Sequence, residues 1–193
     1  MNQAAEQYIA ALTRRCGEPA SVAGVESDNP DLGMVLALAF RDYPQPGLLT
    51  GFTYGLSAAS HPQWRDARPE LVITVQSADE AWVHAVAYLA EWQREQHDFA
   101  PGSLFHYGKP VAPESAMNAF LVFEPAAKDE GMFAPIPLEG GQITLRMAYP
   151  LYEGEVGMIQ KVGIRKFMDL PEYDFFSVDR PDLSKRYRVG SPD

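Results

Sequence analysis

Histidine and cysteine are the usual general bases, nucleophiles and metal ligands, and this chain has four histidines and one cysteine: His61, His84, His97, His106 and Cys16. No two histidines are three or four residues apart, the spacing that places a metal-binding pair on one helix or hairpin. Cys16 has no second cysteine with which to form a disulfide, and we expect a small, half-buried apolar residue there. These side chains therefore predict neither a metal site nor a nucleophile.

Paired carboxylates are a second source of chemistry, because two acidic groups can divide general acid and general base work. Four pairs occur: Asp79/Glu80, Asp129/Glu130, Glu153/Glu155 and Asp179/Asp182. A chain with 26 acidic residues produces such pairs by chance, and no second catalytic motif accompanies any of them. The first and third pairs fall at expected helix starts, where carboxylates are favoured by the helix dipole. We expect all four pairs to be solvated surface groups.

Sequence motifs of known enzyme classes are missing. The chain has no glycine-rich phosphate loop, no Gly-x-Ser-x-Gly turn, no His-Glu-x-x-His helix and no paired cysteines for zinc. The sequence therefore predicts a protein without catalysis and without a cofactor. The alternative, an enzyme of an uncharacterised kind, would need a pocket in which several polar side chains converge.

Charge and hydropathy limit the partners. Acidic residues outnumber basic ones by 26 to 16, and a net charge of −10 repels nucleic acid. The densest basic cluster, residues 185–188, has the acidic neighbours Asp179 and Asp182. No apolar run approaches the ~18 residues of a membrane span, and the first residues lack the plan of a signal peptide. We expect a cytoplasmic protein that binds neither membrane nor nucleic acid.

The first predicted element that could position these side chains is a helix near the N-terminus. Residues 3–16 carry apolar side chains at helical spacing, and Gly17 is a typical C-terminal cap. Residues 17–33 are rich in Gly, Pro, Ser, Asp and Asn and predict a loop. Three apolar stretches then predict strands: 34–40, 48–56 and 70–76.

The strongest helix signal follows these strands. Ser77 and Glu80 have the spacing of a capping box, and apolar residues at helical spacing continue to about Gln96. Trp82 belongs to the apolar stripe and is expected in the core. Trp92 has polar neighbours, so core and exposed positions are equally compatible with the pattern.

The second half of the chain alternates loops with short elements. Strands are expected at 119–123, 142–149 and 173–178, with a helix at 152–168. The segments at 97–118 and 124–141 are expected connections, and 181–193 a polar C-terminal tail. Helices placed among strands that do not alternate regularly with them predict an α+β fold with a mixed or antiparallel sheet and packed helices.

Four segments in this order resemble the suppressor-of-fused domain family, especially its bacterial members. They are Thr53-Tyr54-Gly55-Leu56-Ser57, Arg68-Pro69-Glu70-Leu71-Val72-Ile73, the helix from Trp82 to Ala90, and the stretch from Met147 to Glu155. The resemblance covers about 48–180, and residues 1–47 would add a helix and a strand to the same domain. It implies a suppressor-of-fused-like α+β fold that binds protein without catalysis.

What the resemblance implies about partners is more specific. Bacterial relatives are associated with toxin systems, in which they look like immunity proteins, and an acidic immunity protein would suit a basic toxin domain. The alternative is a regulatory or scaffold protein that binds an endogenous partner. The chain is too short for the second domain of the eukaryotic members, so their binding mode between two domains is not carried over. The oligomeric state stays open.

Exposed aromatic residues with acidic neighbours are the expected contact residues of such an interface. The candidates are Trp64, Trp92, Tyr152, Glu153 and Glu155. Each also has a structural alternative: Trp64 could cover the sheet, and Tyr152 could fix the start of a helix.

Overall fold

A mixed eight-stranded sheet forms the centre of the protein, which is described from a computed structural model covering residues 3–65, 67–126, 131–138 and 141–187. Its main path has the order β1-β2-β3-β4-β8-β6-β5, and β7 pairs with β8 beside that path. The strands are β1 (Ser21–Val25), β2 (Val35–Arg41), β3 (Leu49–Tyr54), β4 (Ala67–Val75), β5 (Ser103–His106), β6 (Ala119–Phe123), β7 (Ile136–Leu138) and β8 (Gly141–Leu151). Neighbouring strands are antiparallel except β4 and β8, which are parallel. The predicted α+β fold with a mixed sheet is confirmed.

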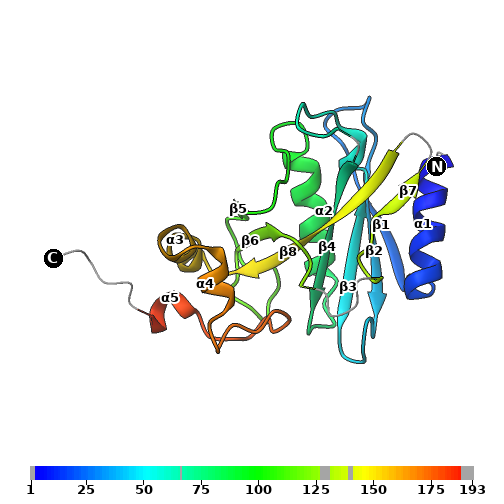
Figure 1. The fold of residues 1–193 in the computed structure, drawn as a ribbon. Helices are drawn as coiled ribbons and strands as arrows, with labels where there is room; N and C mark the ends of the chain where they lie inside the picture. The colour runs from blue at the N-terminus through cyan, green and yellow to red at the C-terminus, as the bar shows by residue number, and fades with distance from the viewer. Residues whose placement is uncertain (1–2, 66, 127–130, 139–140, 188–193) are drawn as a thin grey trace.

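Helices cover both faces of the sheet, so its central strands are buried on both sides (Figure 1). On one face lies α1 (Gln3–Cys16), which buries Tyr8 and Leu12 and is followed by Gly17 with a φ of 85°. On the other lies α2 (Ala81–Gln93), whose Trp82 is fully buried as predicted. The helix approaches β3 closely because Gly51 has no side chain; a Cβ there would lie 2.6 Å from the Val83 methyl groups.

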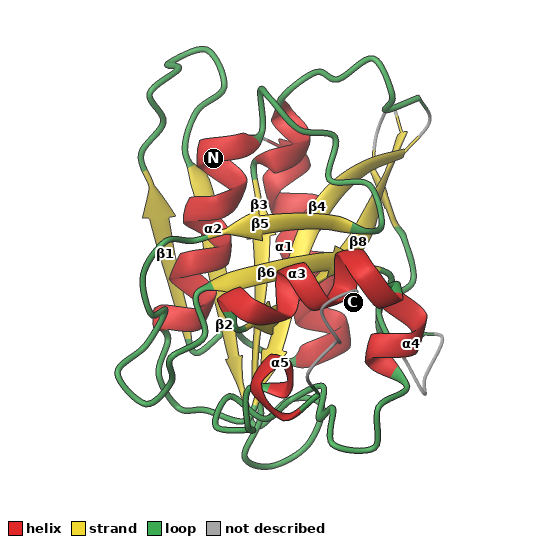
Figure 2. Cartoon of the chain, turned by 90° about the vertical axis from the view of Figure 1, so that its left-hand side faces the viewer, coloured by secondary structure: helices red, strands yellow, loops and turns green. Residues whose placement is uncertain are grey.

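Three short helices pack around the far end of β8, beside β6 (Figure 1). They are α3 (Glu153–Val162), α4 (Ile164–Met168) and α5 (Leu183–Arg186). The predicted single helix 152–168 is interrupted at Gly163, whose φ of 89° is incompatible with a continuing helix. Figure 2 shows β5 and β6 running steeply across the direction of β1, β2 and β3, as a strongly twisted sheet requires.

Several segments predicted as loops, the last predicted strand and the predicted C-terminal tail differ from the structure. The segments expected to be loops contain short strands that exist through pairing: β1 in 17–33, β5 in 97–118 and β7 in 124–141. The predicted strand 173–178 contributes only one bridge, between Gln76 and Ser177, because the Asp174 carboxylate accepts the backbone N–H groups of Phe176 and Ser177 and closes a turn. The polar tail 181–193 begins with α5, which buries Leu183; residues 188–193 lie outside the described residues.

The predicted capping box at α2 is also wrong. The Glu80 carboxylate accepts hydrogen bonds from Ser21 Oγ at 2.6 Å and from the Arg41 guanidinium at 2.6 Å. These bonds lower the pKa of Glu80, with the Ser21 bond as the largest cause. The early backbone N–H of Ala81 is accepted by Asp79 instead. Glu80 therefore joins the start of α2 to β1 and β2, and it does not cap its own helix.

Candidate protein-binding surface

Two of the segments that carry the family resemblance meet at one buried carboxylate, that of Glu70. Its Oε1 accepts hydrogen bonds from the backbone N–H of Gly55 and from both the N–H and the hydroxyl of Ser57, at 2.7–3.0 Å. Its Oε2 accepts the Thr53 hydroxyl at 2.6 Å. Burial raises the pKa of Glu70, and the hydrogen bonds oppose that shift. The Gly-Leu-Ser and Glu-Leu motifs are thus two halves of one structural anchor.

The fourth resembling segment contains a second buried anchor, Glu155. Its carboxylate pairs with the Arg180 guanidinium at 2.5 and 2.8 Å and also accepts the backbone N–H groups of Tyr152 and Leu183, each at 3.0 Å. The Tyr152 hydroxyl donates to the Arg180 carbonyl oxygen at 2.6 Å. The Arg180 guanidinium also lies over the rings of Tyr152 and Tyr173. This cluster fixes the C-terminal segment against the start of α3.

These contacts correct part of the expected interface. Glu155 is 0% exposed, so it has no surface with which to touch a partner, and it is not a solvated carboxylate. Tyr152 is half-buried and its hydroxyl is engaged, which matches its alternative role of fixing a helix start. Glu153 is exposed and its carboxylate lies 2.8 Å from His106 Nδ1. The pair Asp129/Glu130 lies outside the described residues.

Histidine and acidic side chains do not gather into a metal centre: across the described parts of the chain, no group of three or more His, Cys, Asp or Glu side chains could hold an ion. Cys16 is half-buried as expected, and burial raises the pKa of its thiol. Among the described helices, none is long and apolar enough to cross a membrane.

The outer face of α2 carries exposed aromatic rings. Tyr88 and Trp92 are 50% and 51% exposed, and they lie four residues apart, one turn along the helix. Tyr107, in the segment after β5, packs edge-on against Tyr88 with ring centres 6.2 Å apart. We call Tyr88, Trp92 and Tyr107 the α2 aromatic stripe. Trp92 is therefore an exposed residue and not a core residue. Tyr88 and Tyr107 were missed as candidate contact residues from the sequence, although the four-residue spacing between Tyr88 and Trp92 could have indicated Tyr88.

Trp64 has a more constrained position than a freely exposed contact residue. It is half-buried against the core on the α2 side of the sheet, and its indole N–H donates to the Asp98 carbonyl oxygen at 2.8 Å. Its ring forms one wall of a cleft of about 200 Å³. Trp64 thus both covers the sheet, as its structural alternative required, and borders a hollow.

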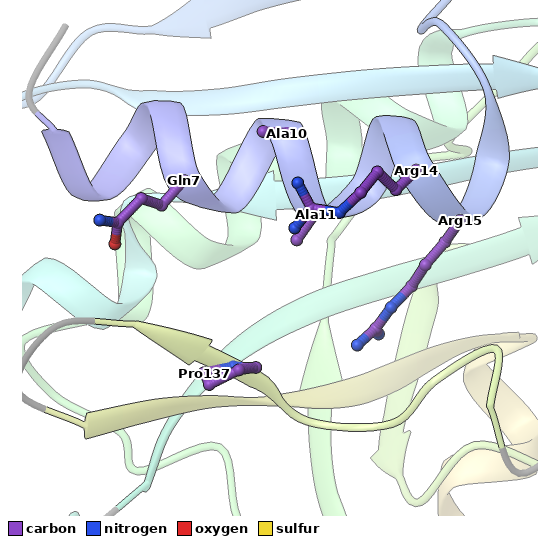
Figure 3. A pocket seen from close by; sticks show the side chains of 6 residues that line it. All are labelled: Gln7, Ala10, Ala11, Arg14, Arg15 and Pro137. Carbon is purple, nitrogen blue, oxygen red and sulfur yellow. The ribbon is translucent and has the colours of Figure 1, made fainter.

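A larger pocket of about 380 Å³ lies on the opposite side of the sheet, between α1 and β7 (Figure 3). Arg15 reaches across toward β7, where its guanidinium donates to the carbonyl oxygens of Ala134 and Pro135 at 2.6 and 3.2 Å. Arg14 and Arg15 belong to the last turn of α1, where cations complement the helix dipole. None of the described residues that line this pocket is a carboxylate, so these residues form no acid–base pair, and Arg15 has a structural use.

Comparison with known proteins agrees with this architecture. The family model described as "Suppressor of fused protein (SUFU)" matches residues 32–181, and the chain therefore belongs to the suppressor of fused family. The match begins earlier than the predicted residue 48 and includes β2. None of the curated proteins compared with the chain matches it significantly.

Solved structures of the family share the fold at low sequence identity. A putative SUFU homologue from Neisseria gonorrhoeae has a TM-score of 0.69 and 13% identity, with 92% of this chain and 94% of that one covered. A chain of the Sufu–Fu complex has a TM-score of 0.64 and 10% identity, covering 95% and 91%. Drosophila Suppressor of Fused has a TM-score of 0.66 and 10% identity, covering 96% of this chain but 52% of that one. The likeness establishes the fold.

Proposed function

We propose that this chain is a non-catalytic binding domain that recognises another protein through the α2 aromatic stripe. The observation that carries the proposal is the half-exposure of both Tyr88 and Trp92 on one helix face. Tyrosine and tryptophan are the residues that contribute most to interface energies, because they bury large area with little loss of side-chain freedom. A solvent-facing stripe of such rings is therefore suited to a partner surface.

The charge around the stripe indicates what kind of partner it fits. Glu91 precedes Trp92 on α2, and the exposed Glu95 lies in the turn just after the helix. Glu91 is held by Arg94 at 2.5 Å, and Glu95 accepts a hydrogen bond from the Asn29 amide. Rings framed by ordered carboxylates in a chain of net charge −10 favour a partner with apolar and basic residues, whose association the charge would also accelerate.

A basic toxin domain is a partner of this chemistry, and the chain would then act as the immunity protein that neutralises it. The alternative is an endogenous basic protein that the chain regulates. Family membership supports protein binding in either case, and the solved Sufu–Fu complex is a complex between a family member and another protein.

Affinity purification with matched variants tests the proposal. The baits are the wild-type chain, the double variant Tyr88→Ala/Trp92→Ala, and Met34→Ala as control. Met34 is 54% exposed and immediately precedes β2; continuing the alternation of that strand back by one residue places it on the face of Leu36 and Leu38, the α1 side of the sheet, away from the stripe. Circular dichroism checks that each bait is folded.

We expect a protein that wild type and Met34→Ala recover equally and that the double variant loses. Truncating a hot-spot aromatic residue costs about 2 kcal/mol, which weakens affinity about 30-fold. Equal recovery by all three baits would reject the stripe as the binding surface. Expressing the recovered partner with and without this chain separates the two roles. A toxin inhibits growth when it is expressed alone, and co-expression of this chain relieves that inhibition; an endogenous regulated protein does neither.

A further inference from the structure

A narrow cleft opens on the α2 side of the sheet, where β4 and β8 run in parallel. Its floor consists of Ala67 and Pro69 from β4 and of Thr144 and Arg146 from β8. They share the face of Leu71 and Ala148, both in the core beneath α2. Gln63, Trp64 and the segment 98–101 form the walls. The volume of about 200 Å³ is below the usual ~300–1,000 Å³ of small-molecule sites. The cleft therefore has room for one group of side-chain size.

Arg146 is the unusual residue in this cleft. It is half-buried in the middle of a strand, yet its guanidinium has no hydrogen bond or ion pair with any residue that the structure describes. By contrast, the buried guanidiniums of Arg94 and Arg180 both pair with carboxylates. A cation that is partly removed from water without a partner is unfavourable unless a ligand supplies the missing charge.

Asp98, the one carboxylate among the described residues that line the cleft, does not supply that charge. Asp98 lines the same cleft, but its Oδ1 accepts the backbone N–H of Ala100, and it forms no ion pair with Arg146 within 4.0 Å. Apolar side chains line much of the rest of the cleft: Trp64, fixed by its bond to the Asp98 carbonyl oxygen, lies in the wall with Pro101, and Pro69 lies in the floor. Gln63 is a polar residue at the same wall.

We propose that this cleft binds a carboxylate group attached to a small apolar body. Arg146 takes the two carboxylate oxygens with its guanidinium, since this pair forms two parallel charge-assisted hydrogen bonds. Trp64 and the prolines cover the apolar body. The same chemistry is present in a free short organic acid and in an acidic side chain or C-terminus of a polypeptide. The proposal is independent of the α2 aromatic stripe.

The three tryptophans of the chain provide the reporter for the test. In a ¹H–¹⁵N NMR spectrum the indole signal of Trp64 reports on the cleft, that of Trp92 on the stripe, and that of buried Trp82 on the core. Phenylacetate is the free-acid probe, and phenylacetamide is its neutral counterpart. A blocked leucine–glutamate dipeptide is the polypeptide probe, with leucine–glutamine as its control.

We expect phenylacetate, the glutamate dipeptide or both to shift the Trp64 signal saturably, while the Trp82 and Trp92 signals stay in place. A response to one probe alone identifies the source of the carboxylate. Arg146→Gln should weaken this binding about tenfold or more. Arg14→Gln, which removes a guanidinium from the pocket between α1 and β7, should leave it unchanged. The proposal is overturned if the amide probes bind as well as the acids, if Arg146→Gln binds like wild type, or if no acid shifts Trp64.

Discussion

Replacing Arg180 by methionine should destabilise the protein by about 3–5 kcal/mol, the usual effect of removing one partner of a buried ion pair. The carboxylate left behind is that of Glu155, which is 0% exposed. Four donors hold it in the native protein, two from Arg180 and two from the backbone of Tyr152 and Leu183. The variant keeps only the two backbone donors, so the buried carboxyl group loses its counter-charge and half of its hydrogen-bond partners.

The magnitude is large relative to total stability, because domains are stable by only about 5–15 kcal/mol. Part of the loss should be recoverable. In the double variant Arg180→Met/Glu155→Gln the buried group is neutral, and its amide oxygen can still accept a backbone N–H. We therefore expect the double variant to be more stable than Arg180→Met alone, whereas additive effects would give that order only if Glu155→Gln were stabilising by itself.

Urea unfolding followed by circular dichroism measures both effects, with the midpoint and the slope recorded for each variant. Arg186→Met is the matched control, since the Arg186 side chain is 59% exposed and its nitrogen lies 3.5 Å from the Glu172 carboxylate. Exposed pairs of this kind contribute about 0–1 kcal/mol. If Arg180→Met loses no more stability than Arg186→Met, the reasoning from burial is wrong.

Three further substitutions test a buried carboxyl group and two glycines. Burial raises the pKa of Glu70 above its unfolded value of about 4.5, so the folded protein binds more protons than the unfolded chain, and stability falls as the pH rises from the unfolded pKa through the folded one. Glu70→Gln lacks this titration. The unfolding free energy of the wild type minus that of the variant should therefore decrease as the pH rises between the unfolded and the folded pKa of Glu70. A difference that stays constant over this pH range would contradict a raised pKa for Glu70. In α3, Gly157→Ala should stabilise by about 0.5–1 kcal/mol, because open space surrounds the position and alanine favours a helix. Gly154→Ala should destabilise by about 1–3 kcal/mol, because its Cβ would collide with the Ser184 side chain; thermal melting that ranks the two variants in the other order would disprove the packing argument.

Local patterns predicted the elements whose residues decide their own structure. The helix at 3–16 and the strand at 119–123 agree with the structure at both ends, and Trp82 lies in the core as its place in the apolar stripe required. By contrast, β1 is a five-residue strand that includes Ala23 and Gly24, which have little strand preference. It forms because β2 offers it a hydrogen-bonded edge, and that edge cannot be recognised from the segment itself.

The roles of individual carboxylates depended on residues distant in sequence. Glu80 has the local spacing of a cap, but Ser21 and Arg41 on neighbouring strands compete successfully for it. Glu155 has the local spacing of a solvated helix start, and only the folded chain brings Arg180 to it. For the proposed binding surface, the spacing along α2 would have been sufficient to indicate Tyr88, which was not predicted from the sequence. The cleft, by contrast, joins Trp64 to Arg146 through the pairing of β4 with β8.

The parallel pairing of β4 with β8 also has a consequence for synthesis of the chain. Strands β1 to β4 form a continuous antiparallel run and can pair as soon as they leave the ribosome. One edge of β4, a strand made mostly of apolar residues, then has no neighbour until the part of β8 that pairs with it has been made, which requires the chain to extend to Met147. An unpaired apolar strand edge is a template for aggregation. The nascent protein is therefore most prone to aggregation after β4 and before β8 has been synthesised, and chaperone binding would be most useful during that interval.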